Sequence, residues 1–286
     1  MLLREVEYVR PATLEEAVRL LGEYDGARVL AGGQTLVNVM KQRAASPDVL
    51  VDIGRLDKLR TIGFSADGSA LEIGSMVTLT QLISASEVEV ARPILAEVAS
   101  TVADVQVRNR GTLGGNLCVN DPTNHFPPLV VALRGSLTIL SSSGERTVSA
   151  EDFFVGVYET AAVEGDLVTR ISIPTRSSGS GDAMSGVTLG AHGTYVANAA
   201  VSVTDGAWCI ALGCVGAIPI RATAVEDALT GTDLDEAVVR AAVAGLGATL
   251  DPPGDVHGSA DYRRSLAETA VVRAVLQAAG RARGES

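Results

Sequence analysis

The sequence predicts a protein of mixed α-helix and β-strand that divides into two units. Amphipathic helix patterns alternate with short apolar strand patterns from residue 13 onward, which favours a mixed class over an all-α or all-β one. With 286 residues the chain is long enough to build more than one core. The segment TRSSGSGD, residues 175–182, has the composition of a linker, so we expect a domain boundary near residue 176.

The first residues predict a compact unit of helix, strand, glycine turn, helix and strand. Thr13, with Glu16 three residues later, predicts a capping box at the start of a helix. ARVLAGG, residues 27–33, predicts a buried strand that ends in a glycine turn, and TLVNVMKQR, residues 35–43, predicts the helix that follows. DVLVDIG, residues 48–54, predicts the next strand, which completes an α/β unit.

The remaining elements of both units follow from the same signals. Asp67-Gly68 predicts a hairpin turn, and Pro174 ends the last strand before the linker. Helices are expected at 78–86, 92–103, 126–135, 235–247 and 259–282, a hairpin at 137–150, and strands at 166–174, 195–205 and 207–220.

Composition and charge limit the classes of function. A formal net charge of -11 argues against non-specific binding to nucleic acid, whose phosphates would be repelled. Three cysteines are too few for a disulfide scaffold or a four-cysteine iron–sulfur cluster, and we expect Cys209 and Cys214 in the core. No apolar run reaches the length of a membrane span and the first residues are not a signal peptide, so a cytoplasmic protein is expected.

Two glycine-rich stretches are the candidate binding motifs: AGGQTL, residues 31–36, and RNRGTLGGNL, residues 108–117. Glycine lets main-chain N–H groups form a concave anion site, and a following helix adds its positive end. Neither stretch has the lysine of a P-loop or the spacing of a dinucleotide-binding fingerprint. From the residues alone, two interpretations remain: tight structural corners, or two turns that bind one phosphate-bearing ligand.

These two motifs resemble the flavin motifs of the FAD-binding medium subunits of the molybdenum hydroxylases, the xanthine dehydrogenase and carbon monoxide dehydrogenase family. Segments 50–59, 145–160, 166–174 and 258–276 fit the same family. The resemblance implies an α+β fold: a two-subdomain FAD-binding domain of the vanillyl-alcohol-oxidase (PCMH) type over 1–176, with subdomains of about 1–56 and 57–176. A smaller α+β domain of the carbon-monoxide-dehydrogenase flavoprotein type, with a three-stranded sheet, would follow over 177–286.

The resemblance also implies which residues contact the FAD. Those around the pyrophosphate would be Ala31, Gly32, Gly33, Gln34, Thr35 and Leu36 on one side and Thr112, Gly114, Gly115 and Asn116 on the other. Further contacts would come from Cys118, from Asp121, from Leu167 and Val168 near the flavin ring, and from Tyr195 beside it. No catalytic side chain or metal ligand is expected in this chain.

Two positions depart from the family pattern. His125 stands where many relatives have an aspartate beside the cofactor, and the lysine or arginine that often precedes the Tyr195 position is missing. His125 is either a loop histidine bonded to the backbone or a neighbour of the cofactor. His192 is either a turn residue or a side chain that approaches the flavin, and with His257 these histidines show no metal or triad spacing.

The function that the resemblance implies is an FAD-carrying electron-transfer subunit of a heterotrimeric molybdenum hydroxylase. A large partner would carry the molybdenum cofactor, a small partner two [2Fe–2S] clusters, and the complex would be a dimer of heterotrimers with an external electron acceptor. One alternative is a stand-alone FAD-dependent oxidoreductase, which the 3% aromatic content disfavours. Another is a non-catalytic assembly partner that has lost flavin, which the intact glycines disfavour. A Gly114→Val substitution is expected to abolish flavin retention and to leave a flavin-free protein unaffected.

Overall fold

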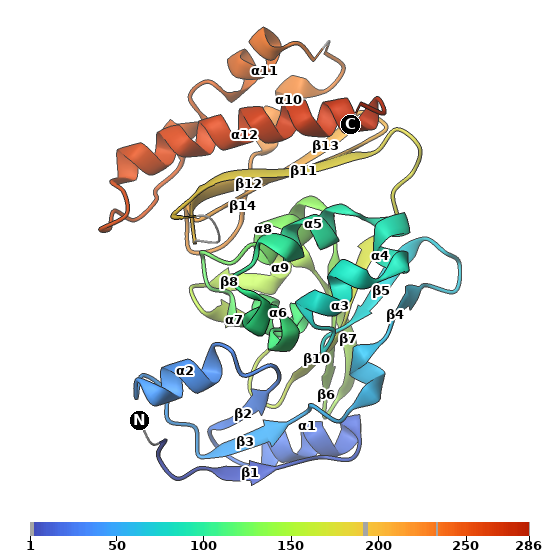
Figure 1. The fold of residues 1–286 in the computed structure, drawn as a ribbon, viewed down its shortest axis with the longest axis vertical. Coiled ribbons are helices and arrows are strands. Elements are labelled where there is room, and N and C mark those ends of the chain that lie inside the picture. The colour runs from blue at the N-terminus through green and yellow to red at the C-terminus, as the bar shows by residue number, and fades with distance from the viewer. Residues whose placement is uncertain (1–2, 191–193, 233, 286) are drawn as a thin grey trace.

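The computed structural model describes residues 3–190, 194–232 and 234–285. In these residues three main β-sheets and a two-stranded hairpin are combined with helices (Figure 1). The predicted α+β class is confirmed. In Figure 1 the first sheet lies at the lower end of the view, the second in the middle and the third at the top, in the same order as along the chain.

The first sheet is parallel, with the strand order β1-β3-β2. Its elements are β1 (Glu7–Val9), α1 (Leu14–Glu23), β2 (Ala27–Leu30), α2 (Leu36–Lys41) and β3 (Val49–Asp52). The sequence patterns predict α1, β2, α2 and β3 but not the short β1. Only half of the predicted capping box forms, because Thr13 accepts from the Glu16 N–H whereas the Glu16 carboxylate accepts from Ala12 N–H.

The second sheet is antiparallel, with the order β4-β5-β10-β6-β7. Its strands are β4 (Ile62–Phe64), β5 (Ala70–Gly74), β6 (Ser136–Ser141), β7 (Gly144–Ser149) and β10 (Leu167–Pro174). The expected Asp67-Gly68 turn joins β4 to β5, with Gly68 at a φ of +73°. The largest apolar core lies between this sheet and the helices that cover it.

The same part of the chain contains helices and short elements, several of which pack on the second sheet. They are η1 (Asp57–Arg60), α3 (Leu79–Ser84), α4 (Ser86–Ala91), α5 (Ile94–Thr101), α6 (Val105–Arg110), α7 (Leu113–Val119), α8 (Phe126–Ala132), α9 (Ala150–Phe153), β8 (Phe154–Gly156) and β9 (Glu159–Thr160). The second glycine motif is therefore not one turn, as its composition suggested. Of its three glycines, only Gly111 lies between α6 and α7, whereas Gly114 and Gly115 belong to the first turn of α7.

The third sheet is antiparallel, with the order β11-β12-β13-β14. It contains β11 (Gly181–Thr188), β12 (Tyr195–Thr204), β13 (Ala207–Gly213) and β14 (Ile220–Arg221), and its helices are α10 (Thr223–Leu229), α11 (Glu236–Val243), η2 (Leu246–Thr249) and α12 (Ala260–Ala282). The prediction of a three-stranded sheet is wrong, because β14 adds a fourth strand. Arg221 of β14 pairs with Ala211, and the Glu226 carboxylate holds the Arg221 guanidinium. β11 also starts inside the expected linker, at Gly181.

A buried ion pair joins the segment between α4 and α5 to the third sheet. The Arg92 guanidinium lies 2.8 Å from both carboxylate oxygens of Asp182 and donates to the Pro174 carbonyl at 2.7 Å. Both side chains are almost fully buried, at 4% and 7% exposure. Cys209, on β13, and Cys214, directly after it, are both buried, as expected for core cysteines.

Candidate cofactor site

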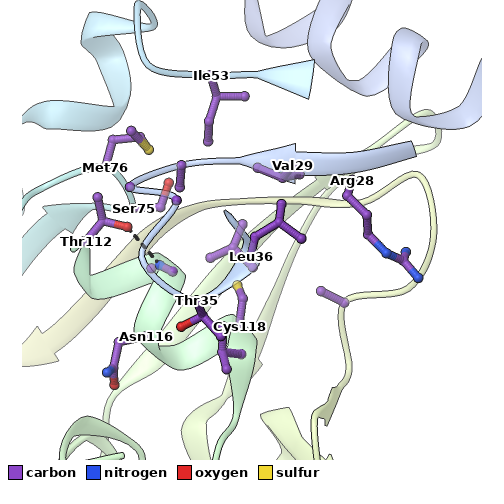
Figure 2. A pocket seen from close by; sticks show the side chains of 18 of the residues that line it. Arg28, Val29, Thr35, Leu36, Ile53, Ser75, Met76, Thr112, Asn116 and Cys118 are labelled. Atoms are coloured by element: carbon purple, nitrogen blue, oxygen red, sulfur yellow. Dashed lines mark hydrogen bonds between the residues drawn. The ribbon is translucent and has the colours of Figure 1, made fainter. Parts of the chain in front are cut away.

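A cavity of about 560 Å³ lies where the first sheet meets α7 and β10 (Figure 2). Both glycine motifs border it. The first contributes the turn between β2 and α2, and the second contributes the first turn of α7. Residues 79 positions apart in the sequence, Gly32 and Gly111, come together at this place. The two motifs are therefore walls of one cavity rather than two unrelated corners.

The first wall depends on close approach of two main chains. A Cβ atom on Gly32 would lie 2.0 Å from the Arg110 carbonyl oxygen, so only glycine fits there. Gly33 has a φ of +72°, which turns the chain into α2. Thr35 occupies the N-cap position of α2, but its side chain makes no capping hydrogen bond, so its hydroxyl remains available to a ligand.

The second wall is the start of α7, packed against the end of β5. The Thr112 hydroxyl caps the helix by accepting from Gly115 N–H at 3.0 Å, a bond drawn in Figure 2. Gly114 N–H donates to the Ser75 carbonyl, and a Cβ on Gly114 would lie 2.6 Å from that oxygen. The expectation that Gly114→Val leaves a flavin-free protein unaffected is therefore wrong, because valine would collide with Ser75 whether or not a ligand is bound.

Two polar atoms of the wall lack partners. The Ser75 hydroxyl and the Asn116 side-chain oxygen are buried, and neither has a hydrogen-bond partner among the described residues. Buried polar groups are nearly always hydrogen-bonded, so these atoms fit a ligand with polar groups of its own. The sequence patterns did not single out Ser75. Its only signal is its place directly after the predicted strand that ends at Gly74.

Thirteen of the fifteen residues expected to contact FAD border this cavity. They are Ala31, Gly32, Gly33, Gln34, Thr35, Leu36, Thr112, Gly114, Gly115, Asn116, Cys118, Leu167 and Val168. The Cys118 side chain is exposed in this wall, and α7 carries no acidic or basic side chain. The wall is thus uncharged along α7 and accommodates both apolar and polar parts of a ligand.

Asp121 and Tyr195 do not border the cavity. The Asp121 carboxylate accepts hydrogen bonds from Thr123 and from the Tyr158 hydroxyl, at 2.7 to 3.1 Å. The Tyr195 ring lies 4.5 Å from the His125 ring, tilted by 49°, and burial raises the pKa of its hydroxyl. The resemblance places Leu167, Val168 and Tyr195 around one flavin ring. In the structure Leu167 and Val168 border the cavity, whereas Tyr195 does not.

His125 is buried at the N-cap of α8, and its Nε2 atom has no partner among the described residues. Burial lowers the pKa of this imidazole to about 4, so it is neutral at physiological pH. This nitrogen gives no support to the interpretation of His125 as a backbone-bonded loop histidine. His192, the other histidine considered beside the cofactor, lies outside the described residues.

Within the part of the chain that the structure describes, no three histidine, cysteine or acidic side chains gather into a group that could hold a metal ion. No helix there is long and apolar enough to cross a membrane.

Family comparisons agree with this geometry. Residues 4–176 match the family described as the FAD binding domain in molybdopterin dehydrogenase, and residues 180–278 match the CO dehydrogenase flavoprotein C-terminal domain. The chain therefore belongs to the FAD-binding medium subunits of the molybdenum hydroxylases. It is an oxidoreductase subunit with an FAD-binding domain, as the two motifs predicted.

Individual relatives are similar over almost their whole length. The carbon monoxide dehydrogenase medium chain of Hydrogenophaga pseudoflava is 36% identical over 94% of this chain and 95% of its own. The nicotine 6-hydroxylase medium subunit of Paenarthrobacter nicotinovorans is 34% identical over 98% of this chain and 100% of its own. A solved carbon monoxide dehydrogenase from Hydrogenophaga pseudoflava superposes with a TM-score of 0.94 at 37% identity, covering 98% of this chain and 99% of that one.

Proposed function

We propose that this chain is the FAD-carrying electron-transfer subunit of a heterotrimeric molybdenum hydroxylase. The observation that carries the proposal is the cavity of about 560 Å³ between the two glycine motifs, with the unpartnered Ser75 hydroxyl and Asn116 oxygen in its wall. Bound there, FAD supplies a redox group that accepts and releases one or two electrons. The residues of this chain bind and orient it and shield it from water.

The proposed contacts follow the two walls. Ala31, Gly32, Gly33, Gln34, Thr35 and Leu36 would hold the pyrophosphate together with Thr112, Gly114, Gly115 and Asn116. Main-chain N–H groups at a glycine turn and at a helix N-terminus are suited to this negative charge. Cys118, Leu167 and Val168 would line the less polar part of the cofactor, and Asp121 and Tyr195 would lie beyond the present cavity edge, next to whatever part of the cofactor extends there.

The proposed domain division follows the same frame. Residues 1–176, with subdomains of about 1–56 and 57–176, would bind FAD, and residues 177–286 would form the C-terminal domain. Support comes from the chain segment between Pro174, where β10 ends, and Gly181, where β11 begins. The cofactor cavity lies between the two proposed subdomains, because Gly32 belongs to one and Thr112 to the other.

Partner subunits complete the proposal. Among the described residues no group of metal ligands could hold a cluster, and we infer that electrons reach FAD from partner subunits. We infer a small partner with two [2Fe–2S] clusters, a large partner with the molybdenum cofactor, a dimer of such heterotrimers, and an external acceptor. The relatives are themselves named as medium chains or subunits of dehydrogenases and hydroxylases, which supports an assembly of this kind.

The test is to purify the full chain from its native host under mild conditions and to measure FAD, molybdenum and iron in the eluate. We expect FAD from this chain, with molybdenum and iron eluting in the same complex. FAD without either metal, in a protein that oxidises a small substrate by itself, would establish a stand-alone oxidoreductase instead. A colourless chain that binds no added FAD would establish a non-catalytic partner.

A further inference from the structure

A second, smaller cavity of about 190 Å³ adjoins the cofactor site. Ala31, Gly32, Met76 and Thr112 border both cavities, so these four residues lie between them. The remaining walls of the small cavity come from segments far apart in the sequence. They are Arg10, Asp52, Gly54, Arg55, Arg60, Thr78, Asn109 and Arg110.

The charge of this small cavity is opposite to that of the whole protein. Four arginines and one aspartate line it, which gives 4 − 1 = +3, whereas the chain carries a formal net charge of -11. Burial opposes ionisation of Asp52, but hydrogen bonds from Tyr8, Gly54 and Arg10 hold the pKa of its carboxyl below the usual value. Asp52 is therefore ionised, as the sum assumes, and the cavity keeps its excess of positive charge.

Two of the arginines are fixed in place and two are not engaged. Arg10 reaches the Asp52 carboxylate at 3.0 Å, and Arg60 donates to the Gly54 carbonyl at 2.8 Å. Within residues 3–190, 194–232 and 234–285, no side-chain hydrogen bond or ion pair involves Arg55 or Arg110. A guanidinium has five N–H donors, so most of the donors around this cavity have no protein acceptor.

We propose that the small cavity is a binding site for an oxyanion of the phosphate type. Guanidinium groups bind phosphate oxygens through paired, charge-assisted hydrogen bonds, and several of them around one cavity favour a doubly charged anion over chloride. The cavity has room for one such group. Its ligands come from both proposed subdomains, Arg10 from the first and Arg110 from the second, so the bound anion joins the two segments on either side of the Gly32 turn.

Calorimetric titration of the full chain with inorganic phosphate, at constant ionic strength set with chloride, tests the site. We expect saturable binding with one phosphate per chain, and a dissociation constant at least tenfold higher in Arg55→Gln and Arg110→Gln. The matched control is Arg176→Gln, because Arg176 is also exposed and its side chain makes no hydrogen bond or ion pair with the residues that the structure describes. Since neither Arg55 nor Arg110 borders the cofactor cavity, this loss distinguishes the small cavity from the FAD pyrophosphate site.

Three outcomes would overturn the proposal: no saturable binding, equal losses in the Arg176 control, or unchanged affinity in Arg55→Gln and Arg110→Gln. Should a glutamine variant unfold, Arg110→Lys keeps the charge but not the paired geometry, and we expect it to weaken phosphate binding while the protein stays folded. Titration with glycerol phosphate separates two sources of the ligand. Equal affinity indicates the phosphate group of a larger molecule, and binding of inorganic phosphate alone indicates the free anion.

Discussion

Gly32→Ala is the substitution that most directly tests how the two glycine motifs form one cofactor site. The Cβ atom of alanine would lie 2.0 Å from the Arg110 carbonyl oxygen, and real Cβ atoms stay at least 3.0 Å from such a neighbour. The two chain segments must therefore move apart by at least 3.0 − 2.0 = 1.0 Å. Neither neighbour can yield by rotating a side chain, because the colliding atoms belong to the main chain.

A displacement of this size is large for hydrogen bonds to a phosphate. An N–H···O contact near 2.9 Å that lengthens by about 1 Å is no longer a hydrogen bond. Each charge-assisted hydrogen bond contributes about 1.5–3 kcal/mol, so the loss of one weakens binding by about tenfold or more. We expect the FAD dissociation constant of Gly32→Ala, measured by quenching of flavin fluorescence, to rise at least tenfold.

Gly68→Ala is the matched control. Gly68 lies in the β4–β5 hairpin at a φ of +73°, and a Cβ there would meet no atom within 4 Å. Its substitution should lower the free energy of unfolding by about 1 kcal/mol through backbone strain and leave FAD affinity unchanged. If Gly32→Ala binds FAD as tightly as the unaltered protein, or if Gly68→Ala loses as much affinity, the close contact between the motifs is not what shapes the site.

Three further predictions concern stability. Arg92→Met should lower the free energy of unfolding, measured in urea, by about 3–5 kcal/mol, because it leaves the Asp182 carboxylate buried without a partner. The control Arg240→Met removes an exposed ion pair and should lower it by only about 0.3–0.5 kcal/mol. Equal losses in the two variants would contradict a special role for the buried pair. Thr112→Ala should cost about 1 kcal/mol by removing the cap of α7, and Thr112→Ser, which retains the hydroxyl, should cost less, as urea titrations of both variants can check. Burial lowers the pKa of His125 to about 4 in the folded protein, against an ordinary value of 6.5, so the unfolded chain binds more protons between these two pH values. The contribution of His125 to the free energy of unfolding is complete above pH 6.5 and should fall by about 3 kcal/mol as the pH drops to 4. In His125→Gln this change should vanish from the pH profile of the free energy of unfolding.

Several elements follow from the sequence because their signals are local. The capping threonine and apolar spacing of α1, the strand before the first glycine motif and the turn at Gly68 depend on neighbours within a few residues. The FAD family was also accessible from the sequence, because each motif is contiguous and specific. Thirteen of the residues that it implied do border one cavity.

Tertiary structure decided the features that depend on residues far apart in the chain. Glycines in RNRGTLGGNL fit a turn by composition, yet the packing of α7 on Ser75 makes two of them helical. The short strands β1 and β14 exist because partners on β3 and β13 pair with them, and no local pattern reports such a partner. Sequence therefore determined the family and the local elements by short-range patterns. Only the fold decided how close Gly32 lies to Arg110, that Ser75 and Asn116 lack partners, and that four arginines meet at one cavity, because these depend on long-range packing.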